Sequence, residues 1–239
     1  MSLRIENLTV HYGQRAVLSG IDLDVADAEI LAVTGPSGCG KSTLLRTLAG
    51  LLPVSSGRIL SADVPVIGTS AERALVFQDD GLLPWRSVRR NVELPLSIRR
   101  VPRARRRTEA ESWLSQVGLA GYEDHLPREL SGGMRQRVQL ARTLAGSPRV
   151  ILADEPFGAL DAQTRTAMQR LLVDVWRKRP TTVVFVTHDV DEALFLADRV
   201  AVLTRDGRLA KVVESSRPRT TGPAMAAERA EVLDGLVAA

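Results

Sequence analysis

Several residue types are scarce in this 239-residue chain, and each scarcity excludes a class of protein. The single cysteine, Cys39, excludes an internal disulfide, which suits a reducing compartment. No apolar run approaches the ~18 residues that a membrane-spanning helix needs. The start of the chain carries charge at Arg4 and Glu6, where a signal peptide would become apolar. We therefore expect a soluble protein whose link to any membrane passes through a partner.

Lysine is also rare, at Lys41, Lys178 and Lys211 only, so arginine carries nearly all of the positive charge. The formal net charge is +4, and the arginines are spread along the chain rather than gathered into one patch. The densest group, Arg99–Arg107, is interpreted as a solvated loop and helix start, with binding to nucleic acid or lipid headgroups as the alternative. The length favours one domain with a sub-domain over two small domains.

A glycine-rich segment at Gly35–Thr43 fits the pattern G-x-x-x-x-G-K-[ST] at every position and follows the apolar run Ile30–Val33. Backbone N–H groups can turn toward phosphates here, Lys41 can reach the outer phosphates, and the Ser42 hydroxyl can ligate Mg²⁺. The next residues are typical of a helix, whose N-terminus adds a positive dipole. A turn without ligand is the alternative. Nucleotide contacts are expected from Gly35, Pro36, Ser37, Gly38, Cys39, Gly40, Lys41, Ser42 and Thr43.

Strand patterns predict an α/β fold. The runs Leu3–Tyr12 and Ile21–Val25, with turns at Gly13-Gln14 and Ser19-Gly20, favour an antiparallel N-terminal part. Later runs alternate with helical stretches, which predicts a mainly parallel sheet. The last two of these runs are apolar throughout, which indicates burial on both faces. The later runs are Ile30–Val33, Ala74–Phe77, Val150–Ala153 and Thr182–Val186.

Helical patterns interrupt and follow the sheet. The strand signal disappears between Gly81 and Arg128, and Arg107–Val117 favours a helix. We therefore expect an inserted α-helical sub-domain over about residues 82–145 within a single domain spanning residues 1–239. Towards the C-terminus the patterns predict a hairpin, an Arg-Pro-Arg linker, a helix and an extension: Val200–Leu203 with Leu209–Val213, then Ala224–Val237 within about residues 218–239.

Two carboxylates, Asp154 and Glu155, follow the run Val150–Ala153 at the carboxyl end of a predicted strand, where α/β sheets bind ligands. Asp154 would hold Mg²⁺ directly or through water. Glu155 could act as a general base on the water that attacks a γ-phosphate. Acidic pairs after strands are otherwise often helix caps, but Pro156 and the intact phosphate loop favour the catalytic interpretation.

A second candidate anion site lies at Leu130–Arg137, which reads Leu-Ser-Gly-Gly-Met-Arg-Gln-Arg. The backbone amides of Ser131, Gly132 and Gly133 precede a helix that is expected to begin near Met134. A simple helix cap is the alternative.

Taken together, these segments resemble the nucleotide-binding subunits of ATP-binding-cassette (ABC) proteins over essentially the whole chain. Gly35–Thr43 matches the family's Walker A motif, Val150–Glu155 its Walker B motif and Leu130–Gln136 its signature motif. The resemblance implies an ABC-type P-loop NTPase fold that hydrolyses ATP with Mg²⁺. It also implies a head-to-tail homodimer in which each ATP lies between Lys41 of one copy and Ser131 of the other.

Single residues match the family by position. Gln78 corresponds to the Q-loop glutamine, which contacts Mg²⁺ or the attacking water and relays movement to the partner. Asp161, in Gly158–Asp161, resembles the D-loop aspartate at the interface between cassettes. His188 resembles the switch histidine, whose neutral imidazole can donate to a γ-phosphate oxygen, and Tyr12 stands where a ring stacks on adenine. Ordinary polar residues at strand ends and a core tyrosine are the alternatives. The implied catalytic residues are Lys41, Gln78, Glu155 and His188, and the implied Mg²⁺ ligands are Ser42, Gln78 and Asp154.

Two departures from the family pattern are visible. Ala153 stands where a bulkier aliphatic residue is common, which affects packing more than chemistry. Met134 replaces a common glutamine, and this form of the signature is typical of importers for nitrate, sulfonate and taurine. Leu82–Val88 also resembles that group, nearest to its aliphatic-sulfonate branch. Within it Trp85 is expected to be partly exposed and to line a groove for a helix of a membrane subunit, with ordinary core as the alternative.

The leading interpretation is an importer ATPase, peripheral on the cytoplasmic face of the inner membrane. Its expected partners are two integral membrane permease subunits and, indirectly, a solute-binding protein. The alternative is a soluble ABC-type ATPase acting on nucleic acid or ribosomes, but such proteins typically fuse two cassettes or insert a long coiled coil, and no nucleic-acid partner is expected. A regulatory module without turnover is disfavoured by Lys41, Asp154, Glu155 and His188.

Overall fold

A computed structural model describes residues 2–158, 160–216 and 225–237. The chain divides into two compact units. The first unit comprises Met1–Leu75, Arg149–Pro156 and Pro180–Ala239, and the second comprises Val76–Pro148 and Phe157–Arg179.

Two sheets make up most of the first unit. An antiparallel sheet has the strand order β2-β1-β4-β5, and a larger sheet has the order β10-β9-β3-β8-β7-β6. In the larger sheet β3 is parallel to β8 and β9, and β7 is parallel to β8. The α/β fold class predicted from the sequence is therefore confirmed. The strands are β1 (Leu3–Tyr12), β2 (Arg15–Val25), β3 (Ile30–Thr34), β4 (Ser56–Ser61), β5 (Val64–Pro65), β6 (Arg73–Val76), β7 (Val150–Asp154), β8 (Thr182–Val186), β9 (Arg199–Leu203) and β10 (Leu209–Glu214).

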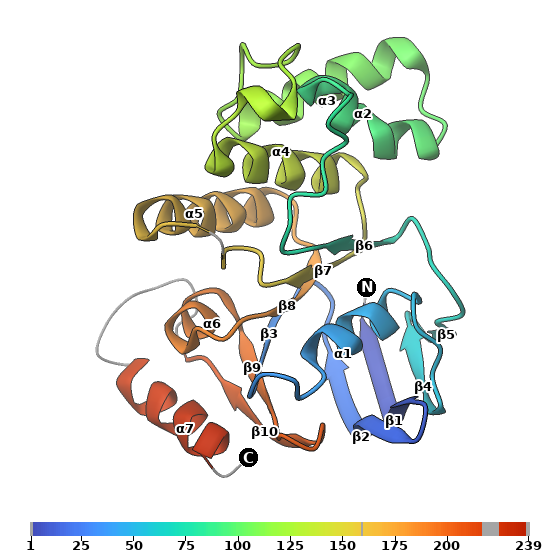
Figure 1. The fold of residues 1–239 in the computed structure, drawn as a ribbon, viewed down its shortest axis with the longest axis vertical. Helices are drawn as coiled ribbons and strands as arrows, with labels where there is room; N and C mark the ends of the chain where they lie inside the picture. The colour runs from blue at the N-terminus through green and yellow to red at the C-terminus, as the bar shows by residue number, and fades with distance from the viewer. Residues whose placement is uncertain (1, 159, 217–224, 238–239) are drawn as a thin grey trace. The chain divides into compact units, whose positions relative to one another are not determined.

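Helix α1 (Lys41–Leu48) packs against both sheets of this unit (Figure 1). Leu44, Leu45 and Leu48 lie on its buried face, in one apolar cluster with residues of β1, β2, β3, β7 and β8. Burial of each leucine contributes about 2 kcal/mol. Strand β8 and residues Val150–Ala153 of β7 are buried, as their continuous apolar runs predicted. Strand β3 is buried throughout as well. This packing fixes the N-terminal end of α1 beside the carboxyl ends of the parallel strands.

One predicted turn is wrong. Ser19-Gly20 lies inside the single strand β2, which runs from Arg15 to Val25. Leu8 pairs with Ile21 and Val10 with Leu18, so β2 carries an extra residue at this point and forms a β-bulge. Gly20 has φ +61°, a conformation that glycine adopts at little cost, and the sequence signal for a turn was this bulge.

The C-terminal part of the first unit contains α6 (Val190–Leu196), the predicted antiparallel hairpin β9–β10, and α7 (Met225–Val237). Helix α7 packs against α6, β9 and β10, with Val232 fully buried. Two ion pairs flank that contact, Lys211–Glu231 at 3.1 Å and Arg229–Asp191 at 2.9 Å. The predicted linker and Ala224 lie within residues 217–224, outside the described residues.

The second unit is helical in its described residues. It contains α2 (Val88–Ile98), α3 (Arg103–Gln116), the 3-10 helix η1 (Pro127–Glu129), α4 (Gly132–Ala145) and α5 (Ala162–Lys178). Helices α2, α3 and α4 pack against one another. Helix α3 begins at Arg103 rather than at Arg107, because the ion pairs Arg105–Glu109 and Arg107–Glu111 support its first turns.

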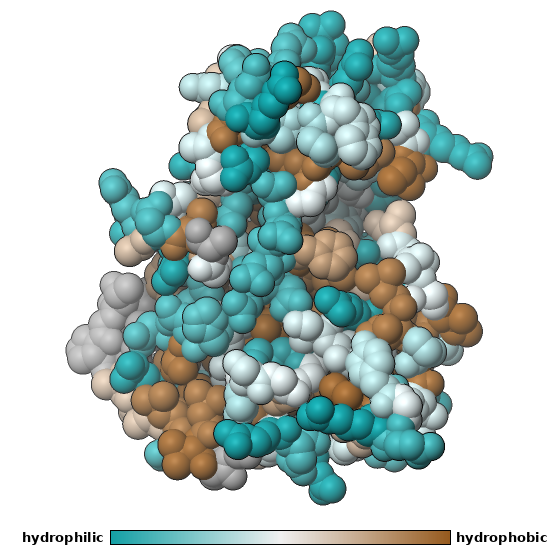
Figure 2. Space-filling view, in the orientation of Figure 1, coloured by the Kyte–Doolittle hydropathy of each residue, from teal (hydrophilic) through white to brown (hydrophobic). Residues whose placement is uncertain are grey.

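Both units expose some large apolar side chains. In the first unit Val64 of β5 and the following Ile67 are exposed, and Figure 2 shows apolar residues over this strand and also over α7. In the second unit Trp85 is 72% exposed, so the core alternative for Trp85 is wrong. None of the helices in the described ranges combines the length and apolar character that crossing a membrane requires.

Candidate functional site

The phosphate loop follows β3 and leads directly into α1. Glycine is required at two of its positions. A Cβ on Gly35 would lie 2.7 Å from the backbone oxygen of Leu203, and a Cβ on Gly40 would lie 2.8 Å from the backbone oxygen of Val17. Gly40 also has φ +101°, which other residues rarely adopt. The glycines therefore let this loop lie against neighbouring backbone.

The start of α1 is suited to an anion. The first N–H groups of an α-helix have no partner within the helix, and Gly40 has no side chain to cap them. The first turn carries no acidic residue, and the helix dipole adds positive potential there. The Lys41 ammonium donates to the backbone oxygens of Gly35 at 2.7 Å and Pro36 at 2.9 Å, so it lies folded over the loop. Exchange of these two carbonyls for phosphate oxygens would bring Lys41 onto a nucleotide.

Cys39 does not face outward from this loop. The residue is 1% exposed and belongs to the apolar cluster of the first unit. Burial raises the pKa of the thiol, with the nearby Lys41 ammonium acting in the opposite direction. Cys39 therefore supports the loop from below by filling a small space, and its expected contact with the nucleotide is limited to its backbone.

The carboxyl ends of β7 and β8 bring Glu155 and His188 together. Glu155 Oε2 lies 3.3 Å from His188 Nδ1, although the two residues are far apart in the sequence. The His188 side chain is 69% exposed and that of Glu155 is 28% exposed, so both can reach a ligand. Glu155 has φ +45°, and its N–H donates to the backbone oxygen of Val186 at 3.0 Å. A left-handed backbone at a non-glycine residue is a strained feature that gathers at functional sites.

Sheet order gives these residues a common edge. Strands β3, β8 and β7 are adjacent and parallel, so the phosphate loop, His188 and the pair Asp154–Glu155 all follow carboxyl ends of neighbouring strands. Ligands of open α/β sheets bind at this edge. Tyr12, at the end of β1 in the same unit, is 49% exposed, so the core alternative for Tyr12 is wrong.

The second anion site belongs to the second unit. Ser131 caps α4 by accepting a hydrogen bond from the Met134 N–H at 3.3 Å, so the helix begins at Gly132 rather than near Met134. A Cβ on Gly133 would lie 2.7 Å from Thr164 Cγ2 of α5. Ser131, Gly132 and Gly133 line a hollow of about 480 Å³. The other residues that line it include Leu119, Tyr122, Met134, Arg137, Asp161 and Thr164.

Asp161 caps α5 beside that hollow. Its carboxylate accepts hydrogen bonds from the N–H groups of Gln163 at 3.1 Å and Thr164 at 3.0 Å. Hydrogen bonding from the side chain and backbone of Thr164 lowers the pKa of Asp161. Ala159, in the same predicted D-loop, lies outside the described residues.

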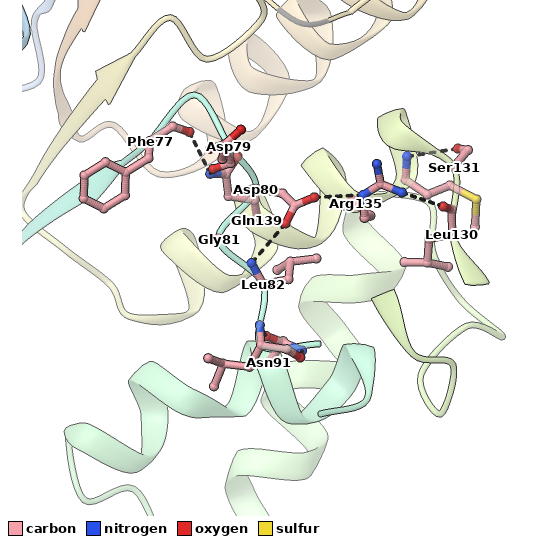
Figure 3. A network of polar contacts seen from close by, with 12 residues as sticks. Phe77, Asp79, Asp80, Gly81, Leu82, Asn91, Leu130, Ser131, Arg135 and Gln139 are labelled. Atoms are coloured by element: carbon pink, nitrogen blue, oxygen red, sulfur yellow. Dashed lines mark hydrogen bonds and ion pairs between the residues drawn. The ribbon is translucent and has the colours of Figure 1, made fainter. Parts of the chain in front are cut away.

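Gln78 is exposed in the segment after β6, and its neighbours are held by α4 (Figure 3). Gln139 Nε2 donates to the backbone oxygens of Phe77 and Asp79, each at 3.0 Å. Arg135 Nε pairs with Asp80 Oδ2 at 2.8 Å. Sequence reasoning missed these contacts because no local pattern marks a glutamine or arginine that bonds to a segment more than fifty residues away.

Comparison with known proteins decides the family. A family model described as ABC transporter matches residues 18–158, which is more than half of the chain. The chain belongs to the ABC transporter family. The predicted resemblance to this family is thereby confirmed. The activity of this chain is that of the family's ATP-hydrolysing subunits.

Two relatives show how close the similarity is. The chain is 48% identical over 202 residues to the taurine import ATP-binding protein TauB of Yersinia pestis, covering 84% of this chain and 79% of the relative. It is 47% identical over 212 residues to the protein of the same name from Pseudomonas savastanoi, covering 87% and 81%.

Solved structures agree with this assignment. One is cbiO1 from Clostridium perfringens, part of an ABC transporter complex, with a TM-score of 0.81 at 29% identity over 89% of this chain and 88% of that chain. Another is a dimeric ATP-binding cassette in a post-hydrolysis state, bound to ADP and Pi. It has a TM-score of 0.79 at 31% identity over 90% of this chain and 99% of that chain.

Proposed function

We propose that this ABC ATPase powers import of a small sulfonate-type anion, such as taurine, or of nitrate, through a separate membrane permease. The relatives named taurine import ATP-binding proteins support the transported class. The single observation that carries the catalytic part is the common edge of β3, β8 and β7, where Glu155 and His188 meet beside the phosphate loop.

At this edge each predicted residue has a proposed role. The loop amides of Gly35–Thr43 and the Lys41 ammonium bind phosphates, and Tyr12 stacks on adenine. Glu155 accepts a proton from the attacking water. His188, held by Glu155, donates to a γ-phosphate oxygen, and Gln78 is the proposed contact of the attacking water.

Mg²⁺ fits the donors present. Ser42 offers a hydroxyl and Asp154 a carboxylate, and these hard oxygens suit Mg²⁺, with Gln78 as a further proposed ligand. The described residues contain no group of three or more histidine, cysteine or acidic side chains able to hold a metal. This suits an ion that relies on substrate phosphates and water for its other ligands. When bound, it would neutralise charge on the β- and γ-phosphate oxygens.

We also propose that two copies assemble head to tail, each ATP lying between the phosphate loop of one and Ser131–Gly133 of the other. The dimeric cassette to which this chain is similar supports the arrangement. Asp161 would then lie at the interface. The proposed domain is a single cassette, residues 1–239, with an α-helical sub-domain over about 82–145 and a C-terminal extension over about 218–239.

Docking to two permease subunits on the cytoplasmic side of the membrane is proposed for the exposed Trp85. Nucleic acid is a weaker candidate partner, because the arginines of Arg99–Arg107 largely bond within the protein. Arg105 and Arg107 pair with glutamates one turn along α3. Arg106 donates to Ser97 Oγ, and Arg99 donates to the backbone oxygens of Gly146 and Ser147.

Two variants test the catalytic assignment. Glu155→Gln should retain ATP affinity and ATP-dependent dimerisation but lose about 10²–10⁴-fold in turnover, because it removes the general base. Lys41→Ala should weaken ATP binding itself. Steady-state ATPase rates and fluorescent-nucleotide titrations measure both effects, and rapid turnover by Glu155→Gln would remove it from the base role. For the solute, ATPase of the chain assembled with its permease and binding protein should rise with taurine or nitrate.

A further inference from the structure

Helix α4 presents one row of polar side chains to the segment that contains Gln78. Arg135, Gln139 and Arg142 recur at intervals of four and three residues, so they lie on one face of the helix. All three bond to residues 77–81, and we refer to them as the clamp residues. Figure 3 shows the contacts of Arg135 and Gln139. Helix α4 and residues 77–81 both belong to the second unit.

Gln139 fixes the backbone on both sides of Gln78. Gln139 is 5% exposed, and its side-chain amide donates to the carbonyls of Phe77 and Asp79. An amide nitrogen carries two hydrogens, so these two bonds use its full donor capacity. Gln78 itself stays exposed between two anchored neighbours.

Arg142 anchors the next residues. Its guanidinium donates to the backbone oxygens of Asp80 at 2.9 Å and Gly81 at 2.7 Å. With Gln139, it gives the carbonyls of Phe77, Asp79, Asp80 and Gly81 a partner on one helix.

Arg135 extends this connection to the signature motif. Its Nε pairs with Asp80 Oδ2 at 2.8 Å, and its Nη1 donates to the backbone oxygen of Leu130 at 2.9 Å. Leu130 directly precedes Ser131, the cap of α4. One planar guanidinium thus joins the Gln78 segment to the residue before the second anion site, a geometry that a lysine cannot reproduce at both ends.

We propose that Arg135 and Gln139 are positioning residues that make residues 77–81 and Leu130–Gly133 one mechanical element. A displacement of Gln78 on ATP binding or hydrolysis then moves the Ser131 site by the same amount. The state of the nucleotide bound by one copy therefore affects how Ser131 of that copy binds the ATP of the other copy. The inference rests on the proposed function, because Ser131 must face the second copy's ATP for the coupling to matter. A clamp that served stability alone would predict no effect on dimerisation below the unfolding temperature.

The test compares the Glu155→Gln chain with the same chain that also carries Arg135→Met. Sedimentation with MgATP should show dimerisation weakened by about tenfold. ATP affinity of the monomer should stay within about twofold, because the phosphate loop belongs to the first unit. In a chain that keeps Glu155, Arg135→Met should lower kcat by about tenfold and leave KM for ATP unchanged. Arg105→Ala, which removes an exposed arginine that pairs with Glu109 on α3, is the control and should change neither quantity.

A double-mutant cycle measures the contribution of the Arg135–Asp80 ion pair directly. Asp80→Asn should weaken dimerisation as Arg135→Met does, and the double variant should be no worse than either single variant. Gln139→Leu keeps a similar side-chain volume but removes both hydrogen bonds to the backbone beside Gln78. It should lower kcat although it leaves the Arg135–Asp80 ion pair in place. If Arg135→Met does not fold, Arg135→Lys takes its place, because it can keep one of the two contacts.

Dimerisation and kcat unchanged in Arg135→Met or Arg135→Lys, with or without a lower melting temperature, would overturn the positioning role. Additive effects in the cycle would also overturn it. Absence of ATP-dependent dimers in the Glu155→Gln chain itself would instead contradict the proposed function. The two failures are therefore distinguishable.

Discussion

At the scale of single residues, the backbone of Glu155 combines a proposed catalytic role with a local cost. Its φ of +45° lies in the left-handed region, which costs a residue with a Cβ about 1–3 kcal/mol and persists only where the surrounding structure imposes it. The hydrogen bond from its N–H to Val186 holds this conformation, and the conformation brings the carboxylate to His188. The strain is thus linked to the geometry of the site.

Substitution at this position should separate stability from activity. Glu155→Gly should be as stable as the unsubstituted chain or more stable by up to about 1 kcal/mol, because relief of strain offsets the entropy of glycine. Glu155→Val should be about 2 kcal/mol less stable than Glu155→Gly, because a β-branched side chain tolerates this φ poorly. Both lose the contact with His188 and should lose ATPase activity. Urea unfolding measures the difference, and equal stabilities would argue against backbone strain.

At the scale of elements, the N-termini of three helices lie at or beside the proposed sites, and they differ in whether and how they are capped. Gly40 leaves the first amides of α1 uncapped, Ser131 caps α4 through one N–H, and Asp161 caps α5 through two. The carboxylate at α5 satisfies the positive end of that helix internally. The amides of α1 and α4 therefore remain the better anion sites.

The α5 cap should make stability depend on pH in a defined window. The folded-state pKa of Asp161 is lowered from the ordinary value of 3.8, so its contribution is present above pH 3.8 and is lost as pH falls through the folded pKa. Asp161→Ala should lower the melting temperature at pH 7, and the difference from the unsubstituted chain should vanish at low pH. Asp161→Asn, which also caps helices well, is the matched control and should remain nearer to the unsubstituted chain at pH 7. A difference that persists below the folded pKa would show that the cap does not depend on the charge.

At the scale of the whole molecule, the two proposed anion sites belong to different compact units. The phosphate loop, Asp154, Glu155 and His188 lie in the first unit, and Ser131–Gly133 and Asp161 lie in the second. In the proposed dimer, a single chain binds a nucleotide through the first unit, and a second copy contributes its ATP to the second site.

Hydrogen exchange should reveal this division. In Glu155→Gln with MgATP, amides of Gly35–Thr43 and of Ser131–Met134 should both gain protection, because the dimer uses both sites. Adding Ser131→Arg, which places a bulky side chain at the second site, should abolish protection at Ser131–Met134 and retain it at Gly35–Thr43. ATP at about 100 times Kd should protect the bound segment by about 2.7 kcal/mol. Protection of both segments in the Ser131→Arg monomer would argue against the sandwich arrangement.

The sequence by itself determined the family, the fold class and the position of each motif. Gly35–Thr43 is recognisable because phosphate binding requires fixed residue types at fixed spacing, which is a local property. The runs that became β3, β7 and β8 were equally clear, because strands buried on both faces are apolar throughout.

Only the tertiary structure decided how distant residues meet. The Glu155–His188 contact, the burial of Cys39 and the bulge at Gly20 depend on strand order and register, which no single segment encodes. The clamp residues depend on one helix face lying against a loop some sixty residues away. Local patterns specify what a segment can become, whereas contacts between segments form only after packing has fixed their positions.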